Sequence, residues 1–375
     1  MRFLLISLLC AALCQTTPQD AKASDNYRDA FAGKFLVGAA LSQDQILGRE
    51  PGTLALVARQ FNALTAENDM KWERIQPEEG RFDFEAPDAL VDFADRHDMD
   101  LTGHVLLWHS QTPDWVFSDG QGGTASREQL LGRLERHMRT VLERYRGRVA
   151  AWDVVNEALN EDGSLRDSPW RQILGNDYVA ETFRLAHAID PEIRLVYNDY
   201  NLFKPAKRAG AVRLVQAIQD AGVPIHAVGM QGHYGLGYPE SLAEVQASIR
   251  AFGAAGVKVE ITELDLSVLP FPEEAEQGAD IDQDLALQAR LDPYAGGLPE
   301  VVADEQAAQF LALFEIYLAE ADTVDRVTFW GVHDGQSWRN GWPMSGRTDY
   351  PLTFDRAGAP KPVARSLWSL ARAAP

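Results

Sequence analysis

Short apolar runs and amphipathic segments alternate along this chain from residue 35 almost to its end. The apolar runs have the length of β-strands, contain many Val, Ile and aromatic residues, and stop at polar or glycine-containing stretches. This pattern is typical of strands that are buried on both faces. Eight such strands are predicted, at residues 35–41, 63–68, 101–109, 150–157, 194–200, 227–233, 257–265 and 326–334.

Segments with helical periodicity lie between the predicted strands. The clearest spans 127–146, and a second apolar stripe in 242–252 ends before Gly256. A strand followed by a helix, repeated eight times without a composition break, predicts an α/β fold: a single-domain closed (β/α)8 barrel, or TIM barrel. An open doubly wound sheet is the alternative. It is less favoured because Gly38-Ala39-Ala40-Leu41 stands where a glycine-rich phosphate turn would follow the first strand.

Polar and aromatic residues gather at the predicted strand ends. In a parallel barrel the C-terminal strand ends carry the active site, so this clustering indicates a functional cleft. The candidates are Glu67, Asn68 and Lys71 after the second strand, His104, Trp108, His109 and Gln111 at the third, Asn156 and Glu157 at the fourth, Asn198, Asp199 and Tyr200 at the fifth, Gln231 and His233 at the sixth, Glu263 and Asp265 at the seventh, and Trp330, His333, Asp334 and Trp338 at the eighth.

Glu157 and Glu263 each close a predicted core strand, and such a pair suits the hydrolysis of an acetal. One carboxylic acid protonates the leaving oxygen while the other carboxylate attacks the anomeric carbon, and a gap of about 5–5.5 Å between them gives retention. For either glutamate alone, the start of a solvated loop is the simpler interpretation. The catalytic interpretation of the pair depends on the polar and aromatic residues that cluster at the other strand ends.

Tryptophans near the strand ends fit a sugar ligand, because a flat ring covers the apolar face of a pyranose. Trp108, Trp330 and Trp338 are the candidates, although core packing is an equally good interpretation of Trp330. A metal-dependent hydrolase that uses His104, His109 or His233 is a weaker alternative, since the sequence has no His-Glu-x-x-His motif. No metal or cofactor is expected. His233 fits better as a hydrogen-bond partner of Glu263, held in turn by Asp265.

The net charge of the chain excludes some classes of binding partner. The 375-residue chain has 55 acidic and 35 basic residues and a formal net charge of −20. This balance argues against nucleic acid or an anionic membrane as a partner, and it is compatible with a neutral substrate. We expect a monomer.

The first residues resemble a secretory signal peptide, with Arg2 followed by an apolar core that ends in polar residues. Residues 1–23 are predicted to be removed, for example after Ala21-Lys22-Ala23, which leaves 24–375 as the catalytic barrel. Both cysteines, Cys10 and Cys14, fall inside this leader, so no disulfide is expected in the mature chain. A lipid anchor on Cys14 is a weaker alternative, because Leu13 is bulkier than lipidation sites usually allow.

Several segments together resemble family 10 of the glycoside hydrolases, the retaining endo-β-1,4-xylanases. They span nearly the whole predicted mature chain and occur at the strand ends that the family would require. The matching segments are Thr65-Ala66-Glu67-Asn68-Asp69-Met70-Lys71-Trp72, Gly103-His104-Val105-Leu106-Leu107-Trp108-His109, Trp152-Asp153-Val154-Val155-Asn156-Glu157, Gln231-Gly232-His233, Ile261-Thr262-Glu263-Leu264-Asp265 and 329–338.

The resemblance implies a role for each matched residue. Glu157 would be the general acid/base and Glu263 the nucleophile of a secreted enzyme that acts on xylan and xylo-oligosaccharides. Asn156 would contact the 2-hydroxyl of the sugar being cleaved, Gln231 would lie beside the nucleophile, and His233 would bond to it. The remaining substrate contacts would be Glu67, Asn68, Lys71 and Gln111 on the non-reducing side, His104 and Trp108 at the cleavage subsite, Tyr200 on the leaving-group side, and Trp330 and Trp338 over the cleft, where they would crowd a glucose hydroxymethyl.

Other interpretations stay open at this point. A cellulase or mixed-linkage glucanase could use the same barrel, and a catalytically silent sugar-binding barrel is a different class. The acidic stretch 266–300 after the seventh strand either shapes the leaving-group side of the cleft or is a solvated loop.

Overall fold

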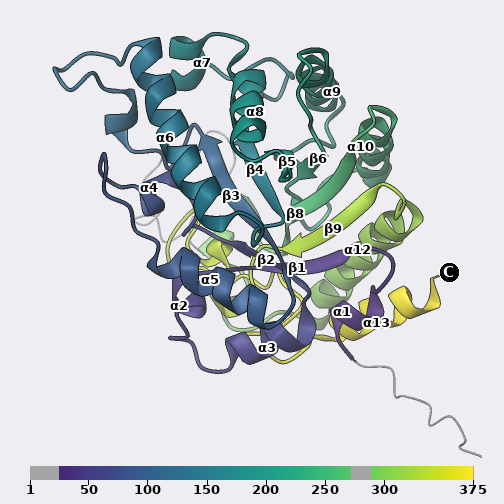
Figure 1. Cartoon of the computed structure of the whole chain (residues 1–375). Helices are drawn as coiled ribbons and strands as arrows, with labels where there is room; N and C mark the ends of the chain where they lie inside the picture. Colours follow the sequence, from purple (N-terminus) through teal and green to yellow (C-terminus); the bar gives the residue numbers. More distant parts are fainter. Residues whose placement is uncertain (1–24, 272–288, 375) are drawn as a thin grey trace, which may run out of the picture.

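The computed structural model describes residues 25–271 and 289–374. Its centre is a closed parallel barrel (Figure 1), in which each strand pairs with its neighbour and β6 pairs with β8 to close the ring. The predicted (β/α)8 barrel is therefore confirmed. The barrel strands are β1 (Leu36–Leu41), β2 (Ala63–Ala66), β3 (Asp100–Trp108), β4 (Ala151–Asn156), β5 (Arg194–Asp199), β6 (Ala227–Met230), β8 (Lys258–Ser267) and β9 (Val324–Phe329).

Helices surround the barrel on the outside (Figure 1). The longer ones follow the strands in alternation, as the periodicity predicts. They are α3 (Thr53–Gln60), α5 (Glu85–Arg96), α6 (Arg127–Tyr145), α8 (Tyr178–Ile189), α9 (Pro205–Asp220), α10 (Leu242–Ala254), α12 (Glu300–Ala319) and α13 (Pro362–Ala373). The short helices are α1 (Tyr27–Ala30), α2 (Gln43–Ile46), α4 (Trp72–Ile75) and α7 (Pro169–Leu174), and 3₁₀ turns cover Asp114–Phe117, Asp334–Gln336 and Trp338–Asn340.

Helix α6 illustrates why these segments fold as they do. The Ser126 side chain caps its first turn by accepting a hydrogen bond from the Gln129 backbone N–H, and the Gln129 side chain accepts one from the Ser126 backbone N–H. The apolar positions predicted for 127–146 then face the barrel, because they recur every three or four residues. The buried residues of α6 are Leu130, Leu134, His137, Met138, Val141, Leu142 and Tyr145.

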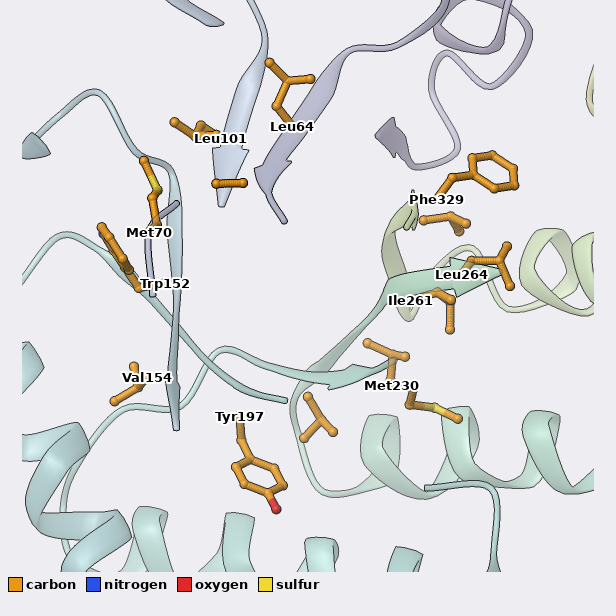
Figure 2. Close-up of a cluster of buried hydrophobic side chains, with 14 of the residues drawn as sticks. Leu64, Met70, Leu101, Trp152, Val154, Tyr197, Met230, Ile261, Leu264 and Phe329 are labelled. Atoms are coloured by element: carbon orange, nitrogen blue, oxygen red, sulfur yellow. The ribbon is translucent and has the colours of Figure 1, made fainter. Parts of the chain in front are cut away.

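Alternate strand residues face the helices and form the main apolar core. Figure 2 shows part of this layer, with Leu64, Leu101, Trp152 and Tyr197 all buried. The indole of Trp152 lies flat against β3, where a Cβ added at Gly103 would come within 2.3 Å of it, so only glycine fits at that position.

The barrel interior is polar at the level of Arg326. This buried side chain of β9 donates hydrogen bonds to the Thr328 hydroxyl (2.9 Å), to the Leu64 carbonyl (2.5 Å) and to the Thr102 hydroxyl. Thr102 lies on β3, which is separated from β9 by two strands, so the last bond crosses the inside of the barrel.

The sixth strand differs from its prediction as a run through residue 233. Strand β6 ends at Met230, and Gly232 adopts a positive φ of 82° that turns the chain. A separate short strand, β7 (His233–Gly235), then pairs with the end of β8, with His233 opposite Asp265. The apolar run itself stops at Met230, before Gln231-Gly232-His233, so the strand ends with the apolar residues and the prediction extended it too far.

The predicted leader, its Cys14 and residues 272–288 of the acidic stretch lie outside the described residues. Across 25–271 and 289–374, none of the helices combines the length and the apolar character needed to span a bilayer.

Candidate active site

A cleft of about 900 Å³ opens at the C-terminal ends of the barrel strands. The two glutamates and the twelve substrate-contact residues that the resemblance implies all line it: Glu67, Asn68, Lys71, His104, Trp108, Gln111, Asn156, Glu157, Tyr200, Gln231, His233, Glu263, Trp330 and Trp338. The other strand-end candidates are not among its lining residues, namely His109, Asn198, Asp199, Asp265, His333 and Asp334. The cleft also contains residues outside that prediction, namely Asn201, Tyr238, Phe271, Arg339 and Trp342.

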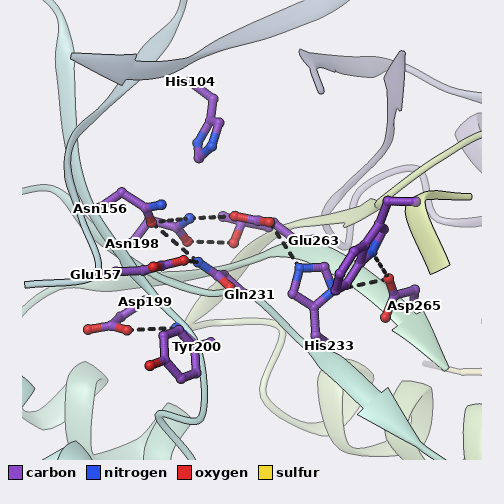
Figure 3. Close-up of polar contacts among 12 residues, drawn as sticks. His104, Asn156, Glu157, Asn198, Asp199, Tyr200, Gln231, His233, Glu263 and Asp265 are labelled. Carbon is purple, nitrogen blue, oxygen red and sulfur yellow. Dashed lines mark hydrogen bonds and ion pairs between the residues drawn. The ribbon is translucent and has the colours of Figure 1, made fainter. Parts of the chain in front are cut away.

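Both carboxylate oxygens of Glu263 accept a hydrogen bond (Figure 3). Its Oε1 accepts from Asn198 Nδ2 at 2.7 Å, and its Oε2 lies 3.1 Å from Nε2 of His233. Burial alone would raise the pKa of Glu263, but the hydrogen bond from His233 and the charges of His233 and Lys71 hold that pKa below its usual value. Glu263 is therefore a fixed, ionised carboxylate at the floor of the cleft.

His233 is held from behind by Asp265. Its Nδ1 lies 3.0 Å from Oδ2 of Asp265, which is fully buried and also accepts from Trp338 Nε1 at 2.7 Å and from Arg339 Nη2 at 2.8 Å. Burial alone would lower the pKa of His233, but the charges of Asp265 and Glu263 outweigh it and raise the pKa to about 9. Against its own burial, the charges of Arg339 and His233 lower the pKa of Asp265 to about 2.

Glu157 follows directly after β4 and has a positive φ of 55°, which a non-glycine residue seldom adopts. Its backbone N–H donates to the Asn198 carbonyl at 2.8 Å, so the conformation is held by the neighbouring strand. The side chain accepts from Trp108 Nε1 at Oε2 and from Gln231 Nε2 at Oε1, both at 3.0 Å. The chain thus turns at Glu157, and its carboxyl group lies in the cleft with one hydrogen bond to each oxygen.

A chain of amides connects the two carboxyl groups (Figure 3). Gln231 Nε2 donates to Glu157 and lies 3.3 Å from Asn156 Oδ1, and Asn198 Nδ2 donates to Glu263 and lies 3.1 Å from the same oxygen. The orientation of Asn198 is fixed because its Oδ1 accepts from the Thr262 hydroxyl at 2.6 Å. Since Asn156 and Asn198 are also register partners of β4 and β5, aligning the predicted ends of these strands could have identified Asn198 as the link.

One end of the cleft is built around the buried ammonium group of Lys71. Its Nζ donates to Asn68 Oδ1 at 2.9 Å and to Gln111 Oε1 at 2.7 Å, and it lies 4.9 Å from the centre of the Trp108 ring. Burial lowers the pKa of Lys71, against the opposing charges of Glu263 and Glu67. Burial also raises the pKa of Glu67 to about 7, although the charge of Lys71 opposes this shift. This end therefore offers fixed amide and carboxyl groups suited to sugar hydroxyls.

His104 and Trp330 form the wall between the two ends. The Nδ1 of buried His104 lies 2.8 Å from Asp153 Oδ2, and its ring packs edge-on against Trp330 with centroids 5.5 Å apart. Trp330 is only 6% exposed and still lines the cleft, so it serves both the core and the cleft wall.

Tyr200 is held at the opposite end by two cations. Its hydroxyl accepts from Arg166 Nη2 at 3.0 Å, and the Nζ of fully buried Lys207 lies 3.4 Å from the centre of its ring. Lys207 also lies 2.9 Å from Asp199 Oδ1, and burial raises the pKa of Asp199 to about 6 although Lys207 opposes the shift. The ring is thereby presented as a fixed flat surface.

Within 25–271 and 289–374, no three or more His, Cys, Asp or Glu side chains are arranged to hold a metal ion. The two cleft histidines that prompted the metal alternative are instead bound to carboxylates, His104 to Asp153 and His233 to Glu263 and Asp265.

Comparisons with known proteins agree with this geometry. The model of glycosyl hydrolase family 10 matches residues 26–369. Endo-1,4-beta-xylanase A of Xylanibacter ruminicola is 43% identical over 366 residues, which make up 98% of this chain and 97% of that protein.

Two solved structures show the same relationship. A family 10 endoxylanase retrieved from a sugarcane soil metagenome has a TM-score of 0.86 at 40% identity, over 93% of this chain and 100% of that one. A mutant protein solved in complex with xylotriose has a TM-score of 0.81 at 34% identity, over 92% of this chain and 99% of that one. The chain belongs to glycosyl hydrolase family 10 and is a glycoside hydrolase.

Proposed function

We propose that this protein is a secreted endo-β-1,4-xylanase that cleaves internal bonds of xylan with retention of anomeric configuration. The observation that carries the proposal is the contrast between the two carboxyl groups. Glu263 is buried, accepts a hydrogen bond at each oxygen and has a lowered pKa, whereas Glu157 directly follows β4 and is partly exposed. A fixed anion beside a second carboxyl group is what double displacement requires.

In the first step, Glu263 attacks the anomeric carbon while Glu157 transfers its proton to the glycosidic oxygen, and the carbon–oxygen bond to the leaving sugar breaks. In the second step, Glu157 takes a proton from water, the water oxygen bonds to the anomeric carbon, and the bond to Glu263 breaks. The Gln231 side chain donates a hydrogen bond to Glu157, and its backbone carbonyl accepts one from the Glu263 N–H at 2.7 Å. One residue therefore helps to fix the positions of both carboxyl groups.

Xylan is favoured as the substrate by the residues around the cleft and by the relatives. Trp330 and Trp338 both line the cleft and lie beside His233, with ring centroids at 6.4 and 5.1 Å from its ring. In this proposal their rings crowd the hydroxymethyl group of a glucose unit and so favour xylose. The cleft offers amides and rings to neutral sugars, the Xylanibacter relative is named as an endo-xylanase, and a similar protein binds xylotriose. In this proposal, Glu67, Asn68, Lys71 and Gln111 hold sugars on the non-reducing side, and Tyr200 stacks on the leaving-group side.

The test compares rates on xylan, carboxymethylcellulose and mixed-linkage β-glucan, with product lengths followed over time. We expect xylan to be cleaved far faster than either glucan, with a mixture of short oligosaccharides as early products. Glu263→Ala should lower the rate by several orders of magnitude, and Glu79→Ala provides the control, because the Glu79 side chain is half exposed and pairs with Arg133 and Arg136 rather than with a cleft residue. Faster cleavage of glucan would make the protein a glucanase, and binding without cleavage would make it a sugar-binding barrel.

Secretion is proposed from the predicted signal peptide at 1–23. Expression of the full chain in a bacterium that exports proteins, followed by N-terminal sequencing of the product, tests it. We expect an exported protein that begins near residue 24. An intact Met1 in the cytoplasm would contradict export, and a lipid-modified N-terminal Cys14 would support the anchored alternative.

A further inference from the structure

Two exposed aromatic side chains at the edge of the cleft have no part in the catalytic network. Over 25–271 and 289–374, three large apolar side chains stand out as exposed: Phe271 and Trp342, each 40% exposed, and Val301, 63% exposed. The rings of Phe271 and Trp342 lie against each other, with centroids 5.6 Å apart, and both residues line the cleft. Exposing large rings to water is unfavourable, so a contacting pair at the edge of a binding cleft indicates a ligand surface.

A buried arginine fixes the backbone under both rings. Arg347 is 4% exposed, and its guanidinium donates to the Trp342 carbonyl at 2.8 Å and to the Pro270 carbonyl at 2.9 Å. Its Nε also donates to the Leu291 carbonyl at 3.1 Å. The loop after β8, which carries Phe271, and the loop after β9, which carries Trp342, are thus tied to one planar group. The ring pair is held in place by this tie.

A second buried arginine connects the pair to the catalytic floor. The guanidinium carbon of Arg339 lies 5.0 Å from the Phe271 ring centre and 4.6 Å from that of Trp338, and Arg339 also donates to Asp265. Trp338 in turn lies against Trp342, with centroids 5.6 Å apart. The aromatic surface is therefore continuous from the wall over His233 to the outer pair.

The neighbours of Phe271 place the pair on the leaving-group side. A Cβ added at Gly235 of β7 would lie 3.3 Å from the Phe271 ring, so the ring packs closely over this strand. Gly235 exchanges backbone hydrogen bonds with Tyr238, whose hydroxyl donates to Asn201 Oδ1 at 3.0 Å. Tyr238 and Asn201 line the cleft together with Tyr200, and Asn201 directly follows Tyr200 after β5. Lys71 and Asn68 follow β2, which lies three strand positions away from β5 around the barrel.

We propose that Phe271 and Trp342 form a sugar-binding platform for a xylose ring on the leaving-group side, beyond the ring that stacks on Tyr200. The proposal rests on the proposed xylanase function and adds a residue-level determinant of chain-length preference. Flat aromatic surfaces cover the C–H face of a pyranose and leave its hydroxyls in water, so a neutral sugar is the ligand that this surface fits.

The test uses two substrates whose sugars reach different parts of the cleft. Xylohexaose labelled at its reducing end extends across both sides, whereas an aryl β-xylobioside places its two sugars on the non-reducing side only. For Phe271→Ala and Trp342→Ala, kcat/KM on xylohexaose should fall about fivefold to tenfold more than kcat/KM on the aryl xylobioside, as expected for the loss of one aromatic contact. Cleavage should also shift toward the reducing end of xylohexaose. Weaker binding on the leaving-group side favours complexes in which fewer sugars occupy that side.

Matched variants separate binding from damage to the fold. Trp342→Phe keeps an aromatic face and should recover most of the loss on xylohexaose, and Val301→Ala, at an exposed position on α12, should leave both rates unchanged. Equal losses on both substrates, or an unaltered cleavage pattern in the Ala variants, would overturn the platform. A wild-type protein that cleaves neither substrate would instead remove the proposed xylanase function, and the platform with it.

Discussion

The imidazole of His233 is held against Asp265, with its Nδ1 3.0 Å from Oδ2 of a carboxylate that is fully buried. The opposite nitrogen of the ring, Nε2, is hydrogen-bonded to Glu263, the proposed nucleophile. The charge of Asp265 therefore acts on Glu263 indirectly, through its effect on the protonation of the ring. Because this carboxylate helps to raise the pKa of His233 to about 9, the ring carries a positive charge at neutral pH and favours ionised Glu263.

Asp265→Asn should lower the pKa of His233, because the variant removes the buried negative charge that helps to raise this pKa to about 9. NMR titration of the His233 imidazole measures the change, and we expect a fall of at least about one pH unit. Asp325→Asn is the control, because Asp325 pairs with Arg194 rather than with a cleft residue. A His233 pKa unchanged from the wild type would contradict the coupling.

The same pair should also shape the pH dependence of stability. The pKa of Asp265 is lowered from 3.8 to about 2, so its contribution is present above pH 3.8 and lost as pH falls through 2. The pKa of His233 is raised from 6.5 to about 9, so its contribution is complete below pH 6.5 and lost as pH rises through 9. The difference in the free energy of unfolding between the wild type and Asp265→Asn should therefore be largest between about pH 4 and 6.5. A constant difference from pH 2 to 10, measured in urea, would contradict this.

Gly229→Ala should disturb the active site without touching a cleft residue directly. A Cβ at Gly229 of β6 would lie 2.3 Å from Asn198 Oδ1, and Asn198 is the donor that fixes one oxygen of Glu263. We expect kcat to fall at least about tenfold and stability to fall by about 1–3 kcal/mol, since the strand cannot move aside. Gly132→Ala in α6, where the nearest atom would be an arginine tip at 3.5 Å, is the control. Wild-type kcat in Gly229→Ala would refute the role of Asn198.

Lys207→Met should destabilise the protein in a pH-dependent manner. Removing the ammonium leaves Asp199 buried without its 2.9 Å ion-pair partner, which costs about 3 kcal/mol or more at pH 7. The pKa of Asp199 is already about 6 with the lysine present and would rise further, so the carboxyl is protonated at pH 5 and the penalty should shrink there. Unfolding in urea at the two pH values measures this change.

Lys204→Met is the matched control for Lys207→Met. Both lysines contact Glu161, Lys207 at 3.1 Å, but the Lys204 side chain is 39% exposed and, among the described residues, has no buried carboxylate beside it. We expect a loss of less than about 1 kcal/mol at either pH. If Lys207→Met cost no more than this control, the buried ion pair would not stabilise the fold.

The barrel could be predicted because its strands are buried on both faces and therefore appear as apolar runs. The ends of these runs also predicted where Glu157, Glu263 and the other cleft residues emerge, since strand order fixes which ends meet. The sixth run was an exception. It was predicted to reach His233, whereas β6 ends with the apolar residues at Met230 and the left-handed backbone of Gly232 separates β7 from β6.

The outer part of the cleft could not be predicted in the same way. Phe271, Trp342 and Tyr238 lie in loops, where no periodicity relates one residue to another, and their positions depend on long-range ties such as those made by Arg347. Lys207 lies on helix α9, and its periodicity predicts a buried position but not the ring of Tyr200 against it.

The proposed function requires Glu157 and Glu263 to act by double displacement on a xylan chain. Proton NMR during the first minutes of hydrolysis of a xylo-oligosaccharide tests it most directly, because the anomer that forms first reports the stereochemistry before mutarotation mixes the two forms. We predict that the β-anomer appears first. Initial formation of the α-anomer would mean single displacement by water and would contradict the role of Glu263 as nucleophile.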